Sequence, residues 1–200
     1  MEMKGEQLVP APQADTWAAL NDPEILKACV PGCESIERIT DTEYTVMMTA
    51  RVGPVAAKFK GKLTLADLNP PNSYSIAFEG QGGVAGFGKG GAQVQLAPEA
   101  DGTRLTYQVK ASVGGKIAQI GSRLVDAAAR KLADDFFTAF NEKVASLHGT
   151  GAHGDEDEHD EHHPEPVPRD PDLPDVNASS LAFFAAGTLV VFVVALVVLF

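Results

Sequence analysis

Residues 101–147, DGTRLTYQVKASVGGKIAQIGSRLVDAAARKLADDFFTAFNEKVASL, decide the fold because they change from the period of a strand to the period of a helix. Apolar side chains first recur at every second position, as in a strand with one packed face. After Gly114-Gly115 they recur at steps of three and four, which predicts one amphipathic helix of about thirty residues. The strand positions are Leu105, Tyr107, Val109, Ala111 and Val113, and the helical stripe is Ile117, Ile120, Leu124, Ala128, Leu132, Phe136, Phe140, Val144 and Leu147.

The period of two extends back through the chain as far as Glu34. Turn signals separate the individual runs, at Gly53-Pro54, Asn69–Asn72 and Asp101-Gly102. Such alternation is typical of an antiparallel sheet with one face in water and one face packed. The long helix has to bury its stripe on that packed face. We therefore predict an α+β fold in which a curved antiparallel sheet of about six or seven strands grips a long C-terminal helix.

The N-terminal segment adds a strand and two short helices. Residues Glu2–Val9 form the predicted strand. A helical pattern then opens at Pro12 and Asp15, and a second one runs from Pro23 toward Cys29, because proline is favoured in the first turn of a helix.

Small residues occupy the N-terminal half of the long helix, where Gly121 and Ala127-Ala128-Ala129 stand, whereas three phenylalanines stand in its C-terminal half. Small residues here indicate either an apolar ligand cavity or close packing of the backbones, and both remain open. For the cavity, we predict a lining of Val46, Met48, Phe59, Phe78, Phe87, Tyr107, Leu124 and Ala128.

Residues 80–91, GQGGVAGFGKGG, contain the spacings G-x-G-x-x-G and G-x-x-x-x-G-K of nucleotide-binding loops. Both motifs need a following helix whose N-terminus holds the phosphates, whereas residues 92–96 alternate like a strand. We reject both motifs and predict a flexible connection between two strands, with Phe87 as a gate at the cavity mouth.

Candidate catalytic and metal-binding groups are scarce. Cys29 and Cys33 flank Val-Pro-Gly without a nearby histidine, so we expect a packed turn with reduced thiols rather than a zinc or redox site. His148 is the only histidine of residues 1–148, and the spacing reveals no pairing of a nucleophile with a base. We therefore predict no catalytic residues and no metal site in this domain. Arg51, Lys58, Lys60 and Lys62 form a basic stripe that is either a solvated face or a contact for anionic headgroups or an acidic partner.

The charge is unevenly distributed. The chain carries a net charge of −11, which argues against nucleic acid as its main partner. Residues 1–148 hold 15 basic and 17 acidic residues, whereas residues 149–180 hold one basic and ten acidic residues. We predict a near-neutral folded domain at 1–148 and a disordered acidic His/Pro-rich linker at 149–180. Its histidines either bind a metal loosely or are simply solvated; they are His153, His159, His162 and His163.

Residues 181–200, LAFFAAGTLVVFVVALVVLF, carry no charge and are apolar all round. Twenty such residues span roughly 30 Å as a helix, the thickness of the hydrocarbon core of a bilayer. We predict a C-terminal transmembrane tail anchor, with Leu181, Phe184, Leu189, Phe192, Leu196 and Phe200 in the membrane. A cleaved lipid-anchor signal is the alternative, but residues 1–10 have no hydrophobic run of a secretory signal. We therefore expect a single-pass protein of the inner membrane whose domain faces the cytoplasm.

Several motifs together resemble one protein family. They are Trp17-x-x-Leu20-x-Asp22-Pro23, Cys29-Val30-Pro31-Gly32-Cys33, Phe59-Lys60-Gly61, Pro70-Pro71-x-x-Tyr74, Gly80-x-Gly82-Gly83-x-x-Gly86-Phe87 and Gly114-Gly115-x-Ile117. In this order they resemble the CoxG family of carbon monoxide dehydrogenase subunits, within the START-like (SRPBCC) superfamily. The resemblance covers residues 1 to about 148 and implies a helix-grip fold with an apolar cavity. It also implies a non-catalytic accessory subunit that recruits a molybdenum-containing, carbon monoxide dehydrogenase-type hydroxylase to the membrane, and a quinone-like lipid that takes its electrons.

Three hypotheses follow for the function. The first is a membrane-anchored protein that binds a quinone in the cavity and helps to pass electrons from the enzyme to the quinone pool, without a covalently bound cofactor. The second is a purely structural membrane anchor or assembly factor with a packed core. The third is a cyclase-like enzyme of the same superfamily, which would need buried acid–base groups in the cavity.

Overall fold

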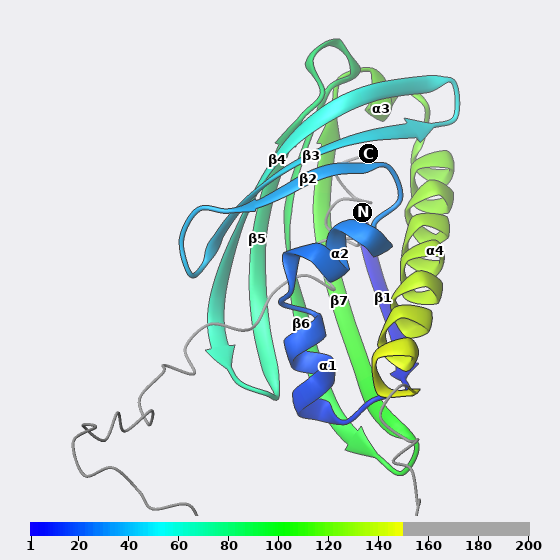
Figure 1. The fold of residues 1–200 in the computed structure, drawn as a ribbon. Coiled ribbons are helices and arrows are strands. Elements are labelled where there is room, and N and C mark those ends of the chain that lie inside the picture. The colour runs from blue at the N-terminus through cyan, green and yellow to red at the C-terminus, as the bar shows by residue number, and fades with distance from the viewer. Residues whose placement is uncertain (150–200) are drawn as a thin grey trace, which may run out of the picture.

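The fold comes from a computed structural model of the chain, which describes residues 1–149. One antiparallel sheet contains all seven strands in the order β1-β7-β6-β5-β4-β3-β2. The sheet curves around α4, and α1 and α2 lie on the same inner side (Figure 1). In chain order the elements are β1 (Glu2–Val9), α1 (Gln13–Ala19), α2 (Pro23–Cys29), β2 (Cys33–Arg38), β3 (Glu43–Val52), β4 (Val55–Asn69), β5 (Ser73–Gln81), the 3-10 turn η1 (Gly83–Ala85), β6 (Phe87–Glu99), β7 (Gly102–Gly114), α3 (Lys116–Gln119) and α4 (Ser122–Gly149).

The predicted helix-grip fold is confirmed, and so is the predicted strand Glu2–Val9. Alternation gives the sheet an inner and an outer face. In β3, for example, Tyr44, Val46 and Met48 are buried while the residues between them are partly exposed. Partners across the antiparallel strands share a face, so the inner residues of neighbouring strands meet in rows against α4.

Two short helices close one side of the interior. The side chain of Asp22 accepts hydrogen bonds from the backbone N–H groups of Glu24 and Ile25 at 2.8 and 3.3 Å, which caps the start of α2. Trp17 of α1 is buried and meets the edge of the Tyr74 ring at a centroid distance of 5.4 Å. Both helices therefore belong to the core rather than to a loop.

The prediction of one continuous C-terminal helix was wrong at its start. Lys116–Gln119 form a short helix of four residues, and α4 begins only at Ser122. Gly121 separates the two with φ +98°, a conformation that residues with a side chain rarely adopt. The break therefore separates Ile117 in α3 from the stripe residues of α4.

The buried face of α4 differs from the predicted stripe, because steps of four residues drift by about 40° each around a helix of 3.6 residues per turn. Leu124 is 53% exposed and Leu147 is 51% exposed, while Ala128 and Leu132 are only partly buried. Phe136, Phe140 and Val144 are buried as predicted, and the face is completed by Val125, Ala129, Ala133 and Phe137.

We predicted that the glycine-rich segment is a flexible connection, and this was wrong for most of its residues. Gly80 and Gln81 end β5, and Phe87–Gly91 begin β6, so only residues 82–86 connect the two strands. The strands can continue through the glycines because their neighbours supply a complete ladder, in which Gly80 pairs with Gly88 and Gln81 with Phe87.

The predicted linker and membrane anchor, apart from Gly149 at the end of α4, lie outside the described residues. Within residues 1–149, none of the helices combines the length and the apolar character that a membrane span requires.

Candidate functional site

Five of the eight predicted lining residues lie together on the inner face of the sheet. Val46 and Met48 of β3, Phe59 of β4, Phe78 of β5 and Tyr107 of β7 are each at most 8% exposed. The β-sheet register explains the arrangement, because Met48 pairs with Phe59 and Val46 lies one row further along. A sixth residue, Ala128 on α4, is half-buried and packs against this core.

The other two predicted residues do not reach the interior. Phe87 is 48% exposed and lies on the outer face, since it shares the parity of Lys89 in β6 and pairs with Gly114. Its ring covers Gly114, where an added Cβ would lie 2.5 Å from the ring. Leu124 is 53% exposed because it lies twelve residues before the buried Phe136 on the same helix, about 120° further round its axis. Phe87 is therefore not placed as a gate to the interior.

A row of glycines on the inner face is the feature that the sequence analysis missed. Gly61 of β4 pairs with Gly80 of β5, which in turn pairs with Gly88 of β6. All three are buried, and the row continues on either side into Val46 and Val113. Glycine inside a strand marks a place where the sheet bends or where another group approaches the backbone closely. Gly61 gave a sequence signal as a single glycine that interrupts a period of two, whereas Gly80 and Gly88 belong to the glycine-rich segment that we predicted to be a connection.

The helix wall also has small side chains in its N-terminal half. Ala129 and Ala133 are fully buried on α4, one turn apart, and α4 contacts β1 and β3. Further along, the wall becomes aromatic, where Phe136 stacks on Phe140 at 5.4 Å and meets Phe137 edge-on at 5.2 Å. The interior therefore has a part built from small groups and a part filled with rings.

The interior is almost wholly apolar. Among the described residues, Thr16, Asn21 and Thr103 are the buried polar ones, and no carboxylate, lysine or arginine is buried. The hydroxyls of Thr16 and Thr103 both donate to the carbonyl oxygen of Ala11, at 3.2 and 2.7 Å. Both hydroxyls are thus satisfied by hydrogen bonds to the backbone, as buried polar groups usually are.

Tyr107 brings one polar group to the seam between the sheet and α4. Its ring stacks on Phe137 at 5.6 Å, and its hydroxyl passes over Gly5, where a Cβ would be only 2.2 Å away. There it lines a hollow of about 390 Å³ between β1 and α4 together with Arg130 and Asp134. Burial and the negative charge of Asp134 raise the pKa of Tyr107. The phenol is therefore a neutral hydrogen-bond donor at every physiological pH.

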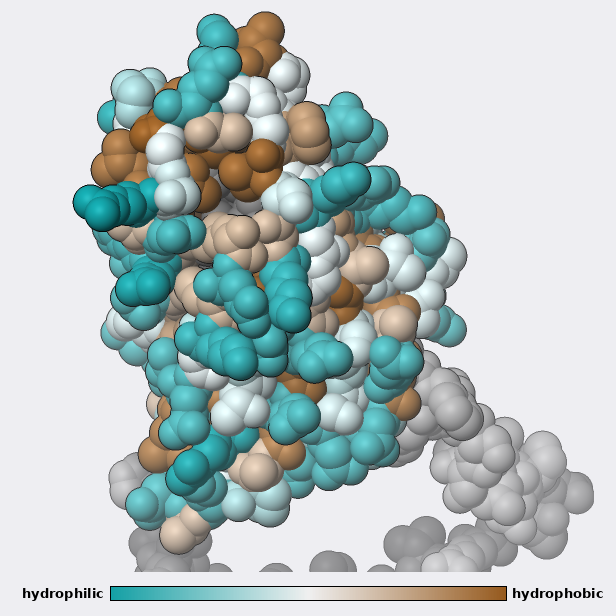
Figure 2. All heavy atoms as spheres, turned by 180° about the vertical axis from the view of Figure 1, so that it is seen from behind, coloured by the Kyte–Doolittle hydropathy of each residue, from teal (hydrophilic) through white to brown (hydrophobic). Residues whose placement is uncertain are grey.

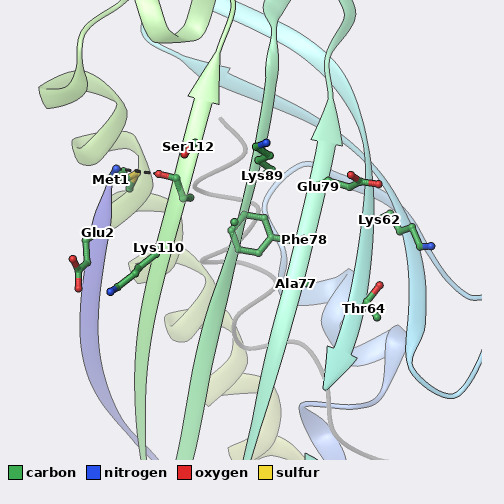
Figure 3. A pocket seen from close by; sticks show the side chains of 12 residues that line it. Met1, Glu2, Lys62, Thr64, Ala77, Phe78, Glu79, Lys89, Lys110 and Ser112 are labelled. Carbon is green, nitrogen blue, oxygen red and sulfur yellow. Dashed lines mark hydrogen bonds between the residues drawn. The ribbon is translucent and has the colours of Figure 1, made fainter. Parts of the chain in front are cut away.

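A larger hollow of about 740 Å³ lies on the outer face, over β4, β5, β6 and β7. Figure 3 shows Lys62, Lys89 and Lys110 around it, with Glu79 between the first two. Its floor is formed by small residues such as Ala77 and Gly90, and the Phe78 ring lies directly beneath Gly90. The hollow is open and carries charged side chains around an apolar floor, so it suits a surface contact rather than an enclosed ligand.

The predicted basic stripe lies on this outer face and is partly neutralised. Lys58 pairs with Glu34 at 2.8 Å, and Lys62 pairs with Glu43 at 2.8 Å. All four side chains remain at least one-third exposed, so these ion pairs contribute little to stability. The stripe is mostly a solvated face with local acidic partners.

Both cysteines are free in the structure. Cys29 is buried, and Cys33 is half-buried beside the carbonyl of Met47. Burial raises the pKa of the Cys33 thiol to about 11, more than Lys27 lowers it.

We predict that Cys33 reacts slowly with iodoacetamide at pH 8. A pKa of about 11 leaves roughly one-hundredth of the thiolate of an ordinary cysteine, so alkylation should be about one hundred times slower than in a model peptide. Because the folded pKa exceeds the unfolded one, the stability linked to this thiol is complete below pH 9 and decreases as the pH rises toward 11. Mass spectrometry of a time course checks the rate, and a rate equal to that of the peptide would contradict the burial.

Residues 1–149 contain no cluster of three or more His, Cys, Asp or Glu side chains able to hold a metal ion. The linker histidines and the predicted anchor residues lie outside the described part of the chain.

Comparison with known proteins relates this chain to one family and to several solved structures. Residues 5–145 match the CoxG family of carbon monoxide dehydrogenase subunits. A conserved protein of Geobacillus kaustophilus is 31% identical, with a TM-score of 0.69 over 73% of this chain and 96% of that one. A Thermus thermophilus protein (19% identity, TM-score 0.57, 74% of this chain and 99% of that one) and the protein Ara h 8.0201 (17%, 0.53, 73% and 98%) share the fold. No curated protein sequence matches the chain significantly.

The neighbours share the fold of this domain, and the match over residues 5–145 covers nearly the whole described domain, including the sheet, the glycine row and α4. The chain belongs to the CoxG family of carbon monoxide dehydrogenase subunits.

Proposed function

We propose that this protein is a membrane-anchored accessory subunit that binds a quinone-like lipid inside its domain. It recruits a molybdenum-containing, carbon monoxide dehydrogenase-type enzyme to the cytoplasmic side of the inner membrane and helps to pass the electrons of that enzyme to the quinone pool. Family membership supports the accessory role. The observation that carries the lipid-binding role is the apolar interior between the sheet, with its glycine row, and the helices.

The interior fits an apolar guest for a physical reason. An isoprenoid chain in water costs about 0.8 kcal/mol for each exposed CH₂ group, so a carrier has to enclose it. At Gly61, Gly80 and Gly88 the inner face of the sheet contributes no side chains, and the N-terminal half of α4 buries only the small side chains of Ala129 and Ala133 beside Val125. Two walls of small groups can part around a flat or thin guest without displacing a bulky side chain.

Tyr107 offers the polar contact that a quinone head group needs. A quinone carbonyl oxygen only accepts hydrogen bonds, and the raised pKa keeps the Tyr107 hydroxyl protonated as a donor. The hydroxyl lies at the seam with α4, on the border between the apolar interior and the hollow beside Arg130. A head group there would leave its tail in the interior.

The outer face supplies a surface for the partner enzyme. Lys62, Lys89 and Lys110 stand around the outer hollow, whose floor of small residues leaves space for protruding side chains of a partner. An acidic surface of the enzyme is the complement that these lysines favour. Recruitment thus uses the face of the sheet opposite the lipid.

Attachment to the membrane is assigned to residues 181–200 from their sequence, as is the localisation of the domain. The purely structural anchor remains the alternative, in which the small residues only pack. The cyclase-like enzyme is less favoured, because the buried described residues include no carboxylate or lysine, and their titratable groups are three tyrosines and Cys29.

The test uses the full chain purified from its own membranes, with lipid extraction and mass spectrometry. We expect an isoprenoid quinone in the wild-type protein and its loss from the Ala129→Trp variant, whose indole would occupy the buried side of α4. Ala127→Trp is the matched control, since Ala127 is exposed two residues away on the same helix. It should retain the lipid.

Stability distinguishes the carrier from the structural anchor. If the interior can open, the free energy of unfolding of Ala129→Trp lies within about 1 kcal/mol of that of the Ala127→Trp control. Overpacking a filled core would lower it by about 1–3 kcal/mol or more. A wild-type protein without any bound apolar molecule, or a strongly destabilised Ala129→Trp, would argue for the structural anchor.

A further inference from the structure

One end of the domain exposes apolar side chains that no described residue covers. We call this end the tip, and define it as residues 51–56, 82–88 and 114–126. It contains the β3–β4 hairpin, the η1 connection with the start of β6, and α3 with the start of α4. These segments meet there, since Gly53 lies against Ile120 and Gly86 lies against Gly115. In Figure 1 they form the end of the molecule at which α3 is labelled.

Three large apolar residues of the tip face solvent. Val84 is 84% exposed, Leu124 is 53% exposed and Phe87 is 48% exposed. Figure 2 shows hydrophobic residues gathering at this end of the domain, whereas the surface below it is mainly hydrophilic. Scattered exposed apolar residues need no explanation, but several on one protruding end indicate an interaction surface.

The charge of the tip is opposite to that of the whole chain. Its residues include three cations, Arg51, Lys116 and Arg123, and one acid, Asp126. All three cations are exposed, and none of them forms an ion pair within the described part of the chain. In a protein of net charge −11, this end combines exposed apolar groups with free positive charge. That combination matches a bilayer surface, whose anionic headgroups attract cations above an apolar layer.

The tip is also the outer end of the lipid-binding interior. Directly behind the exposed residues lie Val52, Ile117 and Val125, each at most 2% exposed. Phe59, a predicted lining residue, packs its ring against Gly82 of the η1 connection. An apolar guest that passes between α3 and this connection would cross no polar layer of the protein.

We propose that the tip docks onto an anionic lipid surface and presents the interior of the domain to the bilayer. The proposal rests on the proposed function for the use of this docking, namely the exchange of the lipid. Chain length permits it. Residues 122–149 form a helix of roughly 42 Å, so the chain leaves α4 at the far end from the tip. Residues 150–180 can span roughly 100 Å at most, enough for the tip to turn toward the membrane that holds residues 181–200.

The experiment places an environment-sensitive probe on the tip of the full chain. In a background of Cys29→Ser and Cys33→Ser, a Val84→Cys substitution is labelled with the fluorophore NBD, and the protein is reconstituted into vesicles of phosphatidylcholine with or without phosphatidylglycerol. Ile39→Cys is the matched control, because Ile39 is 58% exposed in the connection between β2 and β3, outside the tip. Circular dichroism checks that each labelled protein is folded.

We expect the probe at position 84 to shift to the blue and to be quenched by spin-labelled lipids in anionic vesicles, while the probe at position 39 remains in water. Replacing Arg51 and Arg123 by Gln should lower the ratio of docked to free tip by about fivefold for each cation removed. Equal spectra at positions 84 and 39 in anionic vesicles would overturn the proposal. A blue shift of the probe at position 84 that appears only after addition of the oxidoreductase would also overturn the proposal, and would assign the tip to a protein partner.

The outcome is separable from that of the proposed function. Flotation of the vesicles reports attachment by any part of the chain, and lipid extraction reports the bound quinone. A quenched probe without a bound quinone supports the tip and contradicts the carrier. A bound quinone with an unquenched probe does the reverse.

Discussion

A Phe136→Ala variant is expected to lose about 3–5 kcal/mol of its free energy of unfolding. Phe136 has no exposed surface and contacts two other rings, Phe137 and Phe140, at centroid distances of 5.2 and 5.4 Å. Truncation removes the burial of a large apolar side chain and leaves a cavity that rings on both sides keep open. Because small domains unfold with only about 5–15 kcal/mol, this single change would remove a large part of the stability. Urea denaturation followed by far-UV circular dichroism measures it.

Phe87→Ala is the matched control for Phe136. It removes the same side chain from the outer face, where the ring is 48% exposed and covers only Gly114 on one side. We expect a cost of about 1 kcal/mol or less. Equal costs at the two positions would mean that Phe87 is part of the core, and that the assignment of the two faces of the sheet is wrong.

Gly86→Ala is expected to destabilise the domain by about 3 kcal/mol or more. Gly86 has φ +127° and ψ −155°, a region that is essentially restricted to glycine and costs other residues about 1–3 kcal/mol. In addition, a Cβ at this position would lie 2.0 Å from the carbonyl oxygen of Gly114. That oxygen belongs to the backbone of β7 and cannot move aside as a side chain could. Thermal or urea unfolding of the purified variant checks the loss.

Gly83→Ala is the control that distinguishes the two costs at Gly86, namely the steric clash with the Gly114 carbonyl oxygen and the strain of a positive φ. Gly83 lies three residues away in the same connection with φ +59°, and an added Cβ would meet nothing within 4 Å. Only the left-handed conformation is penalised there, by about 1–2 kcal/mol. If Gly83→Ala cost as much as Gly86→Ala, the close approach of residues 86 and 114 would not be what holds this end of the domain together.

In the proposed carrier, the two faces of the sheet bind different partners. The inner face, with its glycine row and rings, has the composition that a lipid needs. The outer face, with exposed lysines beside Glu79, has the composition that a protein partner needs. The tip joins them at one end, because Phe87 stands on the outer face while Ile117 and Val125 close the interior behind it. Because alternate residues of each strand point to opposite faces, the proposed lipid site and the proposed partner surface lie on the two sides of one sheet.

The sequence by itself determined the fold, the family and the two faces of the strands. Its period of two and its period of 3.6 are local properties, and each is repeated often enough along β3 to β7 and α4 to outweigh single exceptions. Five of the eight predicted lining residues are buried on the inner face for this reason, since parity along a strand is preserved once one residue is placed. The apolar tail and the acidic stretch before it are equally local compositions.

Only the tertiary structure decided which residues meet across elements. The row of Gly61, Gly80 and Gly88 depends on the register of three strands, which no period within one strand reveals. The division of the predicted helix into α3 and α4 depends on one left-handed glycine at position 121, which the apolar periodicity on either side of it does not reveal. The tip likewise exists because segments more than sixty residues apart end at the same place. Periodicity describes each element along its own axis, whereas register and rotation are set by contacts between elements, and these contacts appear only when the chain is folded.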